Sequence, residues 1–449
     1  MAGEAASPPK DSRTRAYAVV LVVVTLKVVT LAVILPVVIN RGPTPPSPPL
    51  VGSNVQVDVY ESGSGWDGQF GDDPVVASAP NGSLAVAWEG LYEVAPPPAP
   101  DGTPTFAAAI FVSFSSDGGQ HFSAPRFVAS PGTVSAFLPS LAFDSNGTLF
   151  LAYDNATDSD NQEIIVASAA PGQNFTPGIV AERGQDLGRP WLLALPSGAL
   201  GLAFGYAGLV EWALSTDGGQ SFAPPAILVE GYLTGATQWG GGKVTLVGLS
   251  IGALTSQTVA VWSVSFVPTG SGAPQVGAAV TITMPYPVAV QLPNLSRPGP
   301  SVTAVGGLLY LWYASSNETE LDLMTSNTNG SSWGGPYTIW SPRNTTIETP
   351  VVEEAPNGGY LVLGWQSTQG GYWKAYSAVY NVRTGLLSSP AAVSNANGFP
   401  SMVRNWHGTT MGLAFSDATR FVLVWGDGRG LTGTYGLTHI YASGLTASF

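Results

Sequence analysis

The chain of 449 residues has no cysteine, few charged residues and only three histidines. The absence of cysteine excludes disulfides, thiol nucleophiles and cysteine-ligated zinc. Charged residues make up 10% of the sequence, and 16 basic against 29 acidic residues give a formal net charge of −13. Nucleic-acid binding needs clustered lysine and arginine, so a nucleic-acid partner is not expected. The histidines share no metal-ligand spacing, which argues against a histidine metal site.

Long hydrophobic runs are also scarce, with one exception at residues 17–39. A helix of about 20 apolar residues crosses the hydrocarbon core of a bilayer, so this run predicts a transmembrane anchor helix. A cleaved signal peptide is the alternative, but its apolar region is usually shorter. Three basic residues precede the run and one follows it closely, which places residues 1–16 in the cytoplasm. We therefore expect a single-pass protein of the cell membrane whose remaining part is extracytoplasmic.

The segment after the run agrees with this topology. Residues 40–53 are rich in proline and predict a semi-rigid linker. Eight Asn-x-Ser/Thr sequons follow the run, whereas about three are expected by chance, and they predict glycosylation. The alternative is that Asn-Gly-Ser/Thr sequences form good turns. The candidate asparagines are Asn81, Asn146, Asn155, Asn174, Asn294, Asn317, Asn329 and Asn344.

Residues 54–449 contain a repeat in which short strand-like runs end in an aromatic residue. The aromatic ends are Trp88, Tyr153, Phe204, Trp262, Trp312, Trp365 and Trp425. They recur about every 50–65 residues, and most follow an earlier strand-like run and a tight Gly/Asn turn, without helical periodicity between them. This pattern is typical of the blades of a β-propeller, each a four-stranded antiparallel sheet. We expect one all-β propeller whose central channel is lined by the first strand of each repeat.

A second repeated element follows the third predicted strand of a blade. Ser115–Phe122 and Ser215–Phe222 both read S-x-D-x-G-x-x-F, and weaker copies begin at Ser168 and Ser326. Aspartate side chains accept hydrogen bonds from nearby backbone amides, glycine accepts a positive φ, and the final aromatic packs inward. The residues expected to build these turns are Ser115, Asp117, Gly119, Phe122, Ser215, Asp217, Gly219 and Phe222. We assign them, and His121 within the first turn, a structural role.

These turns and the aromatic strand ends resemble the Asp-box (BNR) repeats of the sialidase-like β-propeller superfamily, across about residues 54–449. The resemblance implies a ligand face built from loops between blades and between second and third strands. It also implies, for enzymes of the superfamily, a tyrosine nucleophile and three arginines that grip the substrate carboxylate. The Phe-Arg-Ile-Pro motif of sialidases is absent. Arginine also prefers exposed loops for ordinary reasons, and whether the chain is an enzyme stays uncertain, with the balance against it.

Candidate residues on that ligand face are Arg189, Arg297, Arg343, Arg404, Arg429 and Glu89. The five arginines follow predicted strands or lie between predicted blades, and Glu89 directly follows Trp88. An acidic loop after Tyr153 supplies a further candidate site: Asp154, Asp158, Asp160 and Glu163. Flexible, oxygen-rich loops suit Ca²⁺, so calcium is the one candidate cofactor, and a solvated acidic loop is the alternative. The first repeat also carries a long insertion, residues 90–107, with either a functional or a decorative role.

Seven aromatic ends predict seven blades, and six blades are the alternative if the weak fourth repeat is an insertion. The last repeat contains only three strands, because too few residues remain after Ser443 for a fourth. Residues 54–60 alternate apolar and polar side chains and have no partner in the first blade. An unpaired strand edge promotes aggregation. We therefore expect 54–60 to form the outermost strand of the last blade, beside 438–443.

Three functions are consistent with these features. The first, which we favour, is a membrane-anchored cell-surface propeller that binds a glycan or a protein without catalysis. The second is a sialidase-like glycoside hydrolase on the same scaffold. The third is a structural component of the cell envelope. The sequence does not identify the ligand or the oligomeric state.

Overall fold

The computed structural model describes residues 43–59, 71–93, 106–128, 135–158, 161–250, 260–268, 274–276, 279–283, 299–315, 319–343, 345–369, 372–397, 411–429 and 438–449. All of the β-structure belongs to one compact unit, Pro46–Phe449. In the part of the chain that is described, no helix is long and apolar enough to cross a membrane. The predicted anchor at 17–39 lies outside that part.

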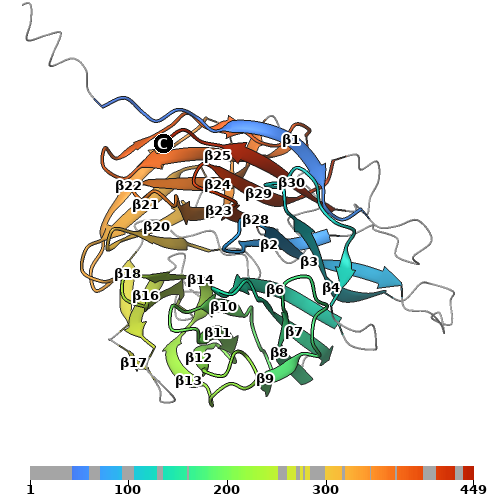
Figure 1. Ribbon diagram of the computed structural model, residues 1–449. Helices are drawn as coiled ribbons and strands as arrows, with labels where there is room; N and C mark the ends of the chain where they lie inside the picture. The colour runs from blue at the N-terminus through green and yellow to red at the C-terminus, as the bar shows by residue number, and fades with distance from the viewer. Residues whose placement is uncertain are drawn as a thin grey trace, which may run out of the picture. The chain divides into compact units, whose positions relative to one another are not determined.

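The unit is an all-β propeller of seven antiparallel sheets (Figure 1), which confirms the predicted fold class and the blade count. Blade 1 is β2 (Gly71–Ser78), β3 (Leu84–Glu93), β4 (Phe106–Ser115) and β5 (Arg126–Phe127). Blade 2 is β6 (Ser135–Phe143), β7 (Leu149–Asp158), β8 (Asn161–Ala169) and β9 (Ile179–Gly184). Blade 3 is β10 (Trp191–Ala194), β11 (Leu200–Tyr206), β12 (Leu209–Ser215) and β13 (Ala226–Glu230). Blade 4 is β14 (Tyr232–Trp239), β15 (Lys243–Leu249) and β16 (Ala260–Val267), with β17 (Gln275–Val276) and β18 (Val280–Thr283) both paired to β16.

Blades 5 to 7 complete the unit. Blade 5 is β19 (Ser301–Val305), β20 (Leu308–Ala314), β21 (Leu321–Ser326) and β22 (Gly334–Trp340). Blade 6 is β23 (Ile347–Glu354), β24 (Tyr360–Gln369) and β25 (Tyr372–Asn381), with β26 (Leu386–Leu387) and β27 (Ala391–Ala392) both paired to β25. Blade 7 is β28 (Met411–Phe415), β29 (Arg420–Asp427), β30 (His439–Thr446) and the N-terminal β1 (Leu50–Gln56).

The hydrophobic core is divided among the seven interfaces between neighbouring blades. Each of seven buried clusters combines side chains from two adjacent blades, and the last cluster joins blade 7 to blade 1. All seven aromatic strand ends are buried in these clusters or between them. At the interface of blades 3 and 4, for example, the Trp212 and Phe266 rings meet edge to face at 5.0 Å. Burial of each such large side chain stabilises the folded propeller by about 1.5–3 kcal/mol.

One aromatic end was assigned to the wrong strand. Trp262 lies on β16, the third strand of blade 4, whereas the second strand is β15. Its indole N–H donates to the Leu249 carbonyl at 3.0 Å and thereby joins the second and third strands. The fourth repeat appeared weak in the sequence because its second strand ends in Leu249 and has no aromatic residue there.

The N-terminal strand closes the ring, as expected. Asn54, Val55 and Gln56 of β1 pair with Ser443, Ala442 and Tyr441 of β30. The observed strand begins at Leu50, inside the predicted linker, and ends at Gln56 rather than at residue 60. The pairing covers the outer edge of β30, so blade 7 receives its fourth strand from the other end of the chain (Figure 1).

The two S-x-D-x-G-x-x-F turns connect third and fourth strands and share one hydrogen-bond pattern. In the first turn, Ser115 Oγ donates to Asp117 Oδ1 at 2.8 Å, and the amides of Gln120 and His121 donate to the same oxygen at 2.9 and 3.1 Å. The second turn repeats these bonds around Asp217. Phe122 packs into the cluster between blades 7 and 1. Phe222 packs likewise into the cluster between blades 2 and 3, so each of these two turns contacts an interface between blades.

Candidate functional site

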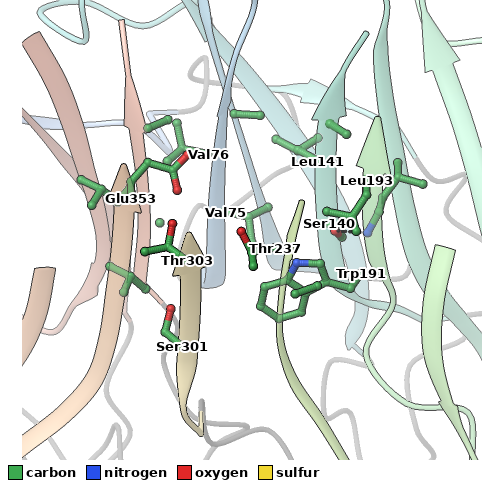
Figure 2. Close-up of a pocket in the computed structure, with 18 of the residues that line it drawn as sticks. Val75, Val76, Ser140, Leu141, Trp191, Leu193, Thr237, Ser301, Thr303 and Glu353 are labelled. Atoms are coloured by element: carbon green, nitrogen blue, oxygen red, sulfur yellow. Dashed lines mark hydrogen bonds between the residues drawn. The ribbon is translucent and has the colours of Figure 1, made fainter. Parts of the chain in front are cut away.

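The innermost strands of all seven blades line a central channel of about 590 Å³ (Figure 2). These strands are β2, β6, β10, β14, β19, β23 and β28, in agreement with the expected lining. The term entrance is used below for the end of the channel at which these strands begin. The loops that join blades, and those between second and third strands, lie at this same end because neighbouring strands alternate in direction.

The innermost strands of three blades are bulged at the entrance. At each bulge, two residues of the innermost strand lie opposite one aromatic residue of the second strand. The pairs are 73–74 of β2 opposite Trp88, 138–139 of β6 opposite Tyr153, and 349–350 of β23 opposite Trp365. The second residue of each pair is proline. Proline is tolerated because an innermost strand has no partner on its channel side and needs no ladder donor there. A bulge bends the strand and re-aims its side chains.

The residue before the proline has an unusual backbone at two of the bulges. Asp73 has φ 48° and Leu138 has φ 54°. Aspartate adopts this left-handed conformation readily, but for leucine it is costly, on the order of 1–3 kcal/mol. Such backbone strain gathers at functional sites. An X-Pro pair near the start of these three innermost strands is the signal for the bulge in the sequence.

Four charged side chains meet at the entrance between blades 1 and 3, and we call them the acid–arginine cluster: Asp72, Asp73, Glu89 and Arg189. The three carboxyl groups are only 1–3% exposed. Arg189 Nη2 donates to Asp73 Oδ1 at 2.7 Å, and the Asp73 amide donates to Asp72 Oδ1 at 2.8 Å. Asp72 and Glu89 face each other across the β2–β3 ladder. Arg189 lies two residues before β10 and also lines the channel.

The electrostatics of this cluster favour protonated carboxyl groups. Burial, followed by the charge of Asp73, raises the pKa of Asp72 well above its usual range, and burial with both aspartates raises the pKa of Glu89 likewise. Arg189 acts in the opposite direction but carries one charge against three carboxyl groups. The amide of Leu138 in the bulged β6 also bonds the Glu89 carboxyl group. A buried acid that keeps its proton can donate a hydrogen bond or a proton.

Of the sequence candidates for the ligand face, the structure brings Glu89 and Arg189 together. Sequence reasoning missed Asp72 and Asp73, although the Asp-Asp-Pro run before the first strand was visible. Arg343 is exposed in the turn between β22 and β23. Arg297 and Arg404 lie outside the described residues.

Arg429 lies in a structural clamp. Its guanidinium pairs with Asp427 and donates to Asn54 Oδ1 at 3.3 Å and to Asn395 Oδ1 at 2.6 Å. The guanidinium carbon also lies 3.9 Å from the centre of the Tyr441 ring. These partners come from β1, from β30 and from the segment after β27, so Arg429 ties the closing strand to blade 7. A guanidinium with this many protein partners is poorly placed to grip a ligand.

The structure separates two of the calcium candidates. Asp154 faces Ile164 across the ladder and Glu163 faces Asn155, so their side chains leave opposite faces of blade 2. Glu163 Oε1 accepts a bond from Arg183 Nε at 2.7 Å, and Asp154 Oδ2 accepts one from Gln162 Nε2 at 3.2 Å. The Asp158 side chain and Asp160 are not described. No group of three possible metal ligands occurs in the described part of the chain, and the calcium site stays a prediction.

Four of the candidate glycosylation sites lie in exposed turns: Asn81, Asn146, Asn174 and Asn329. Each turn joins a first to a second strand or a third to a fourth strand, so all four lie at the end of the ring opposite the entrance. Asn155 lies half-buried within β7. The other three sites, Asn294, Asn317 and Asn344, are outside the described residues.

Comparisons with known proteins show the fold alone. No protein-family model and no curated protein matches the chain. A Dyadobacter fermentans protein of unknown function is similar in structure, with a TM-score of 0.52, 13% identity and coverage of 88% of this chain and 98% of that one. The endosialidase of phage phi92 has a TM-score of 0.51 and 11% identity over 89% of this chain and 70% of its own. The Hadza microbial sialidase Hz136 is less similar, with a TM-score of 0.47 and 13% identity over 84% and 66% of the two chains.

Proposed function

We propose that this chain is a membrane-anchored, extracytoplasmic sialidase-like propeller that binds a glycan or protein ligand at the channel entrance and does not hydrolyse sialosides. The observation that carries the proposal is the acid–arginine cluster, in which Arg189 pairs with Asp73 next to the buried carboxyl groups of Asp72 and Glu89. A sialoside presents a carboxylate, and a guanidinium already bound to Asp73 is a weak partner for it. The Asp73 carboxylate that pairs with Arg189 would repel the sialoside carboxylate as well. A neutral or cationic ligand fits the entrance better.

The membrane and surface assignments rest on sequence and on the position of the sequons. The run at 17–39 has the length and flanking charges of an anchor. The four exposed sequons are accessible to a glycosylating enzyme, and all lie away from the entrance. We also propose that the S-x-D-x-G-x-x-F turns are Asp boxes, because their serine, aspartate and glycine residues make the contacts that this motif requires.

The full-length chain in detergent, applied to a glycan array with neutral, amino and sialylated glycans, tests the proposal. We expect binding to neutral or amino glycans without turnover. A matched assay with fluorogenic sialosides should show no release of fluorophore. Sialoside turnover that is lost in the variant Arg189→Lys would contradict the proposal. Silence in both assays, together with ordered arrays on isolated envelopes, would instead favour a structural role.

The raised pKa of Glu89 favours a second candidate function, a glycoside hydrolase that acts on neutral sugars. A protonated carboxyl group beside an ionised one is the arrangement that protonates a glycosidic oxygen. This second function would be established if the wild type hydrolyses neutral fluorogenic glycosides and the variant Glu89→Gln does not. The control is Glu230→Gln, which changes an exposed carboxylate at the outer edge of blade 3.

A further inference from the structure

The interior of the channel holds a carboxylate that is separate from the acid–arginine cluster. Glu353 lies on β23, and its side chain projects into the channel (Figure 2). It is exposed to the channel space, and no hydrogen bond or ion pair joins it to another described residue. The channel walls surround it, and this enclosure, followed by the charge of Glu354, raises its pKa to about 7. Glu353 is therefore a carboxylate without a counter-charge in an enclosed space.

The remaining wall offers neutral polar groups and aromatic side chains. Ser140 and Trp191 lie on the opposite side of the channel from Glu353, and Thr303 lies on the same side (Figure 2). Thr237 on β14 adds another hydroxyl group. The other charged residues of the lining are Glu354 and Arg189, and Arg189 is bound to Asp73 at the entrance. The described wall thus combines the carboxyl groups of Glu353 and Glu354 with several hydroxyl groups and the indole of Trp191.

We propose that the channel is a binding site for a hexosamine, a sugar with a free ammonium group. This inference rests on the proposed binding function and names a ligand class for it. The ammonium group would pair with Glu353 in a charge-assisted hydrogen bond, which is stronger than a neutral one. Hydroxyl groups of the channel wall, such as that of Thr303 on the same side as Glu353, would bind the ring hydroxyls. A channel of about 590 Å³ is within the range of small-molecule sites.

Two other occupants fit less well. An anionic sugar would meet Glu353 without a free guanidinium to compensate. A metal ion would need several oxygen ligands at close range, and the described residues contain no group of three acidic or imidazole ligands.

The test is calorimetric titration of the full-length chain in detergent with glucosamine, N-acetylglucosamine, glucose and ethylamine. Glucosamine and N-acetylglucosamine share a ring and differ in the charge of the nitrogen. We expect glucosamine to bind about tenfold to a hundredfold more tightly than N-acetylglucosamine or glucose, the range for a hydrogen bond to a charged group. In Glu353→Gln the preference for glucosamine should vanish while the melting temperature is retained. Glu230→Gln should behave as the wild type.

Several results would overturn the inference. The first is equal affinity for glucosamine and N-acetylglucosamine, and the second is a preference for glucosamine that persists in Glu353→Gln. The third is an affinity for ethylamine as high as that for glucosamine, which would show that the site recognises the ammonium group without the sugar. If none of the four compounds binds while the glycan array still finds a ligand, the channel site is overturned and the proposed function stays intact. Silence in both experiments overturns both.

Discussion

At the scale of single residues, the entrance concentrates buried charge that the protein does not fully compensate. Asp72, Asp73 and Glu89 are removed from water, and the guanidinium of Arg189 pairs with Asp73. Burying an ionised carboxylate is costly unless it is paired and hydrogen-bonded. The propeller thus holds Asp72 and Glu89 with raised pKa values at the expense of stability, as binding and catalytic sites commonly do.

The first prediction is that Glu89→Gln stabilises the protein at neutral pH. The raised pKa of Glu89 means that the folded state binds its proton more tightly than the unfolded state does. The wild type therefore loses stability as the pH rises from the unfolded pKa through the folded pKa, and the glutamine variant does not share this loss. Melting temperatures at pH 4, 6 and 8 should show the variant above the wild type at pH 8 and the difference shrinking toward pH 4. A variant that melts lower at pH 8 would contradict the raised pKa.

At the scale of elements, the turns between third and fourth strands join the blades. Gly118 and Gly119 have φ values of 76° and 85°, which glycine adopts without steric cost. The two positions differ in their surroundings. A Cβ on Gly119 would lie 2.5 Å from Val422 Cγ2 of blade 7, whereas a Cβ on Gly118 would have its nearest atom, Ser416 Oγ, at 3.4 Å. Gly119 therefore serves the interface between blades as well as the turn.

The second prediction compares alanine at these two glycines. Gly118→Ala should cost about 1–2 kcal/mol of unfolding free energy, the price of a left-handed non-glycine residue. Gly119→Ala should cost about 1–3 kcal/mol more, because its Cβ would overpack the interface with Val422. Urea unfolding of the two variants measures the difference. Equal losses would mean that the contact with blade 7 adds nothing beyond the turn conformation.

At the scale of the whole molecule, one non-covalent closure holds the ring together. Blade 7 combines β1 with strands from the far end of the chain, and two ion pairs with buried carboxylates lie at this junction. Arg429 joins Asp427 to Asn54, and His439 Nδ1 lies 3.1 Å from Asp58 Oδ2. Opening the junction would expose the edge of β30, and such an edge promotes association between chains.

The third prediction concerns the arginine of the closure. Arg429→Ala should lower the unfolding free energy by about 3–5 kcal/mol, since it leaves Asp427 buried without its counter-charge. The matched control is Arg420→Ala, which breaks an exposed pair with Asp417 and should cost about 0–1 kcal/mol. Denaturant unfolding compares the two. A loss for Arg429→Ala no larger than that of the control would show that the clamp does not hold the ring.

The fourth prediction gives the closure a pH dependence. The hydrogen bond to Asp58 raises the pKa of His439, so the pair stabilises the folded state below the unfolded histidine pKa of about 6.5. That contribution is lost as the pH rises through the folded pKa. The melting temperature of the wild type should therefore exceed that of His439→Gln at pH 5.5, and the two should converge at high alkaline pH. A constant difference across this range would contradict protonation as the source.

Local patterns in the sequence predicted seven blades, with six as the alternative, the turns between third and fourth strands, and the pairing of the closing strand but not its bounds. Strand alternation, the spacing of aromatic ends and the Ser-Asp-Gly turns act over a few residues, and a strand without a local partner had to find one at the far end of the chain. The roles of the charged residues were decided by the tertiary structure. Arg189 meets Asp73 across 116 residues and Arg429 meets Asn54 across 375, and neither spacing carries a signal. Whether an arginine faces a ligand or is held by a carboxylate depends on how the bulged inner strands and the closed ring direct side chains that are far apart in the chain.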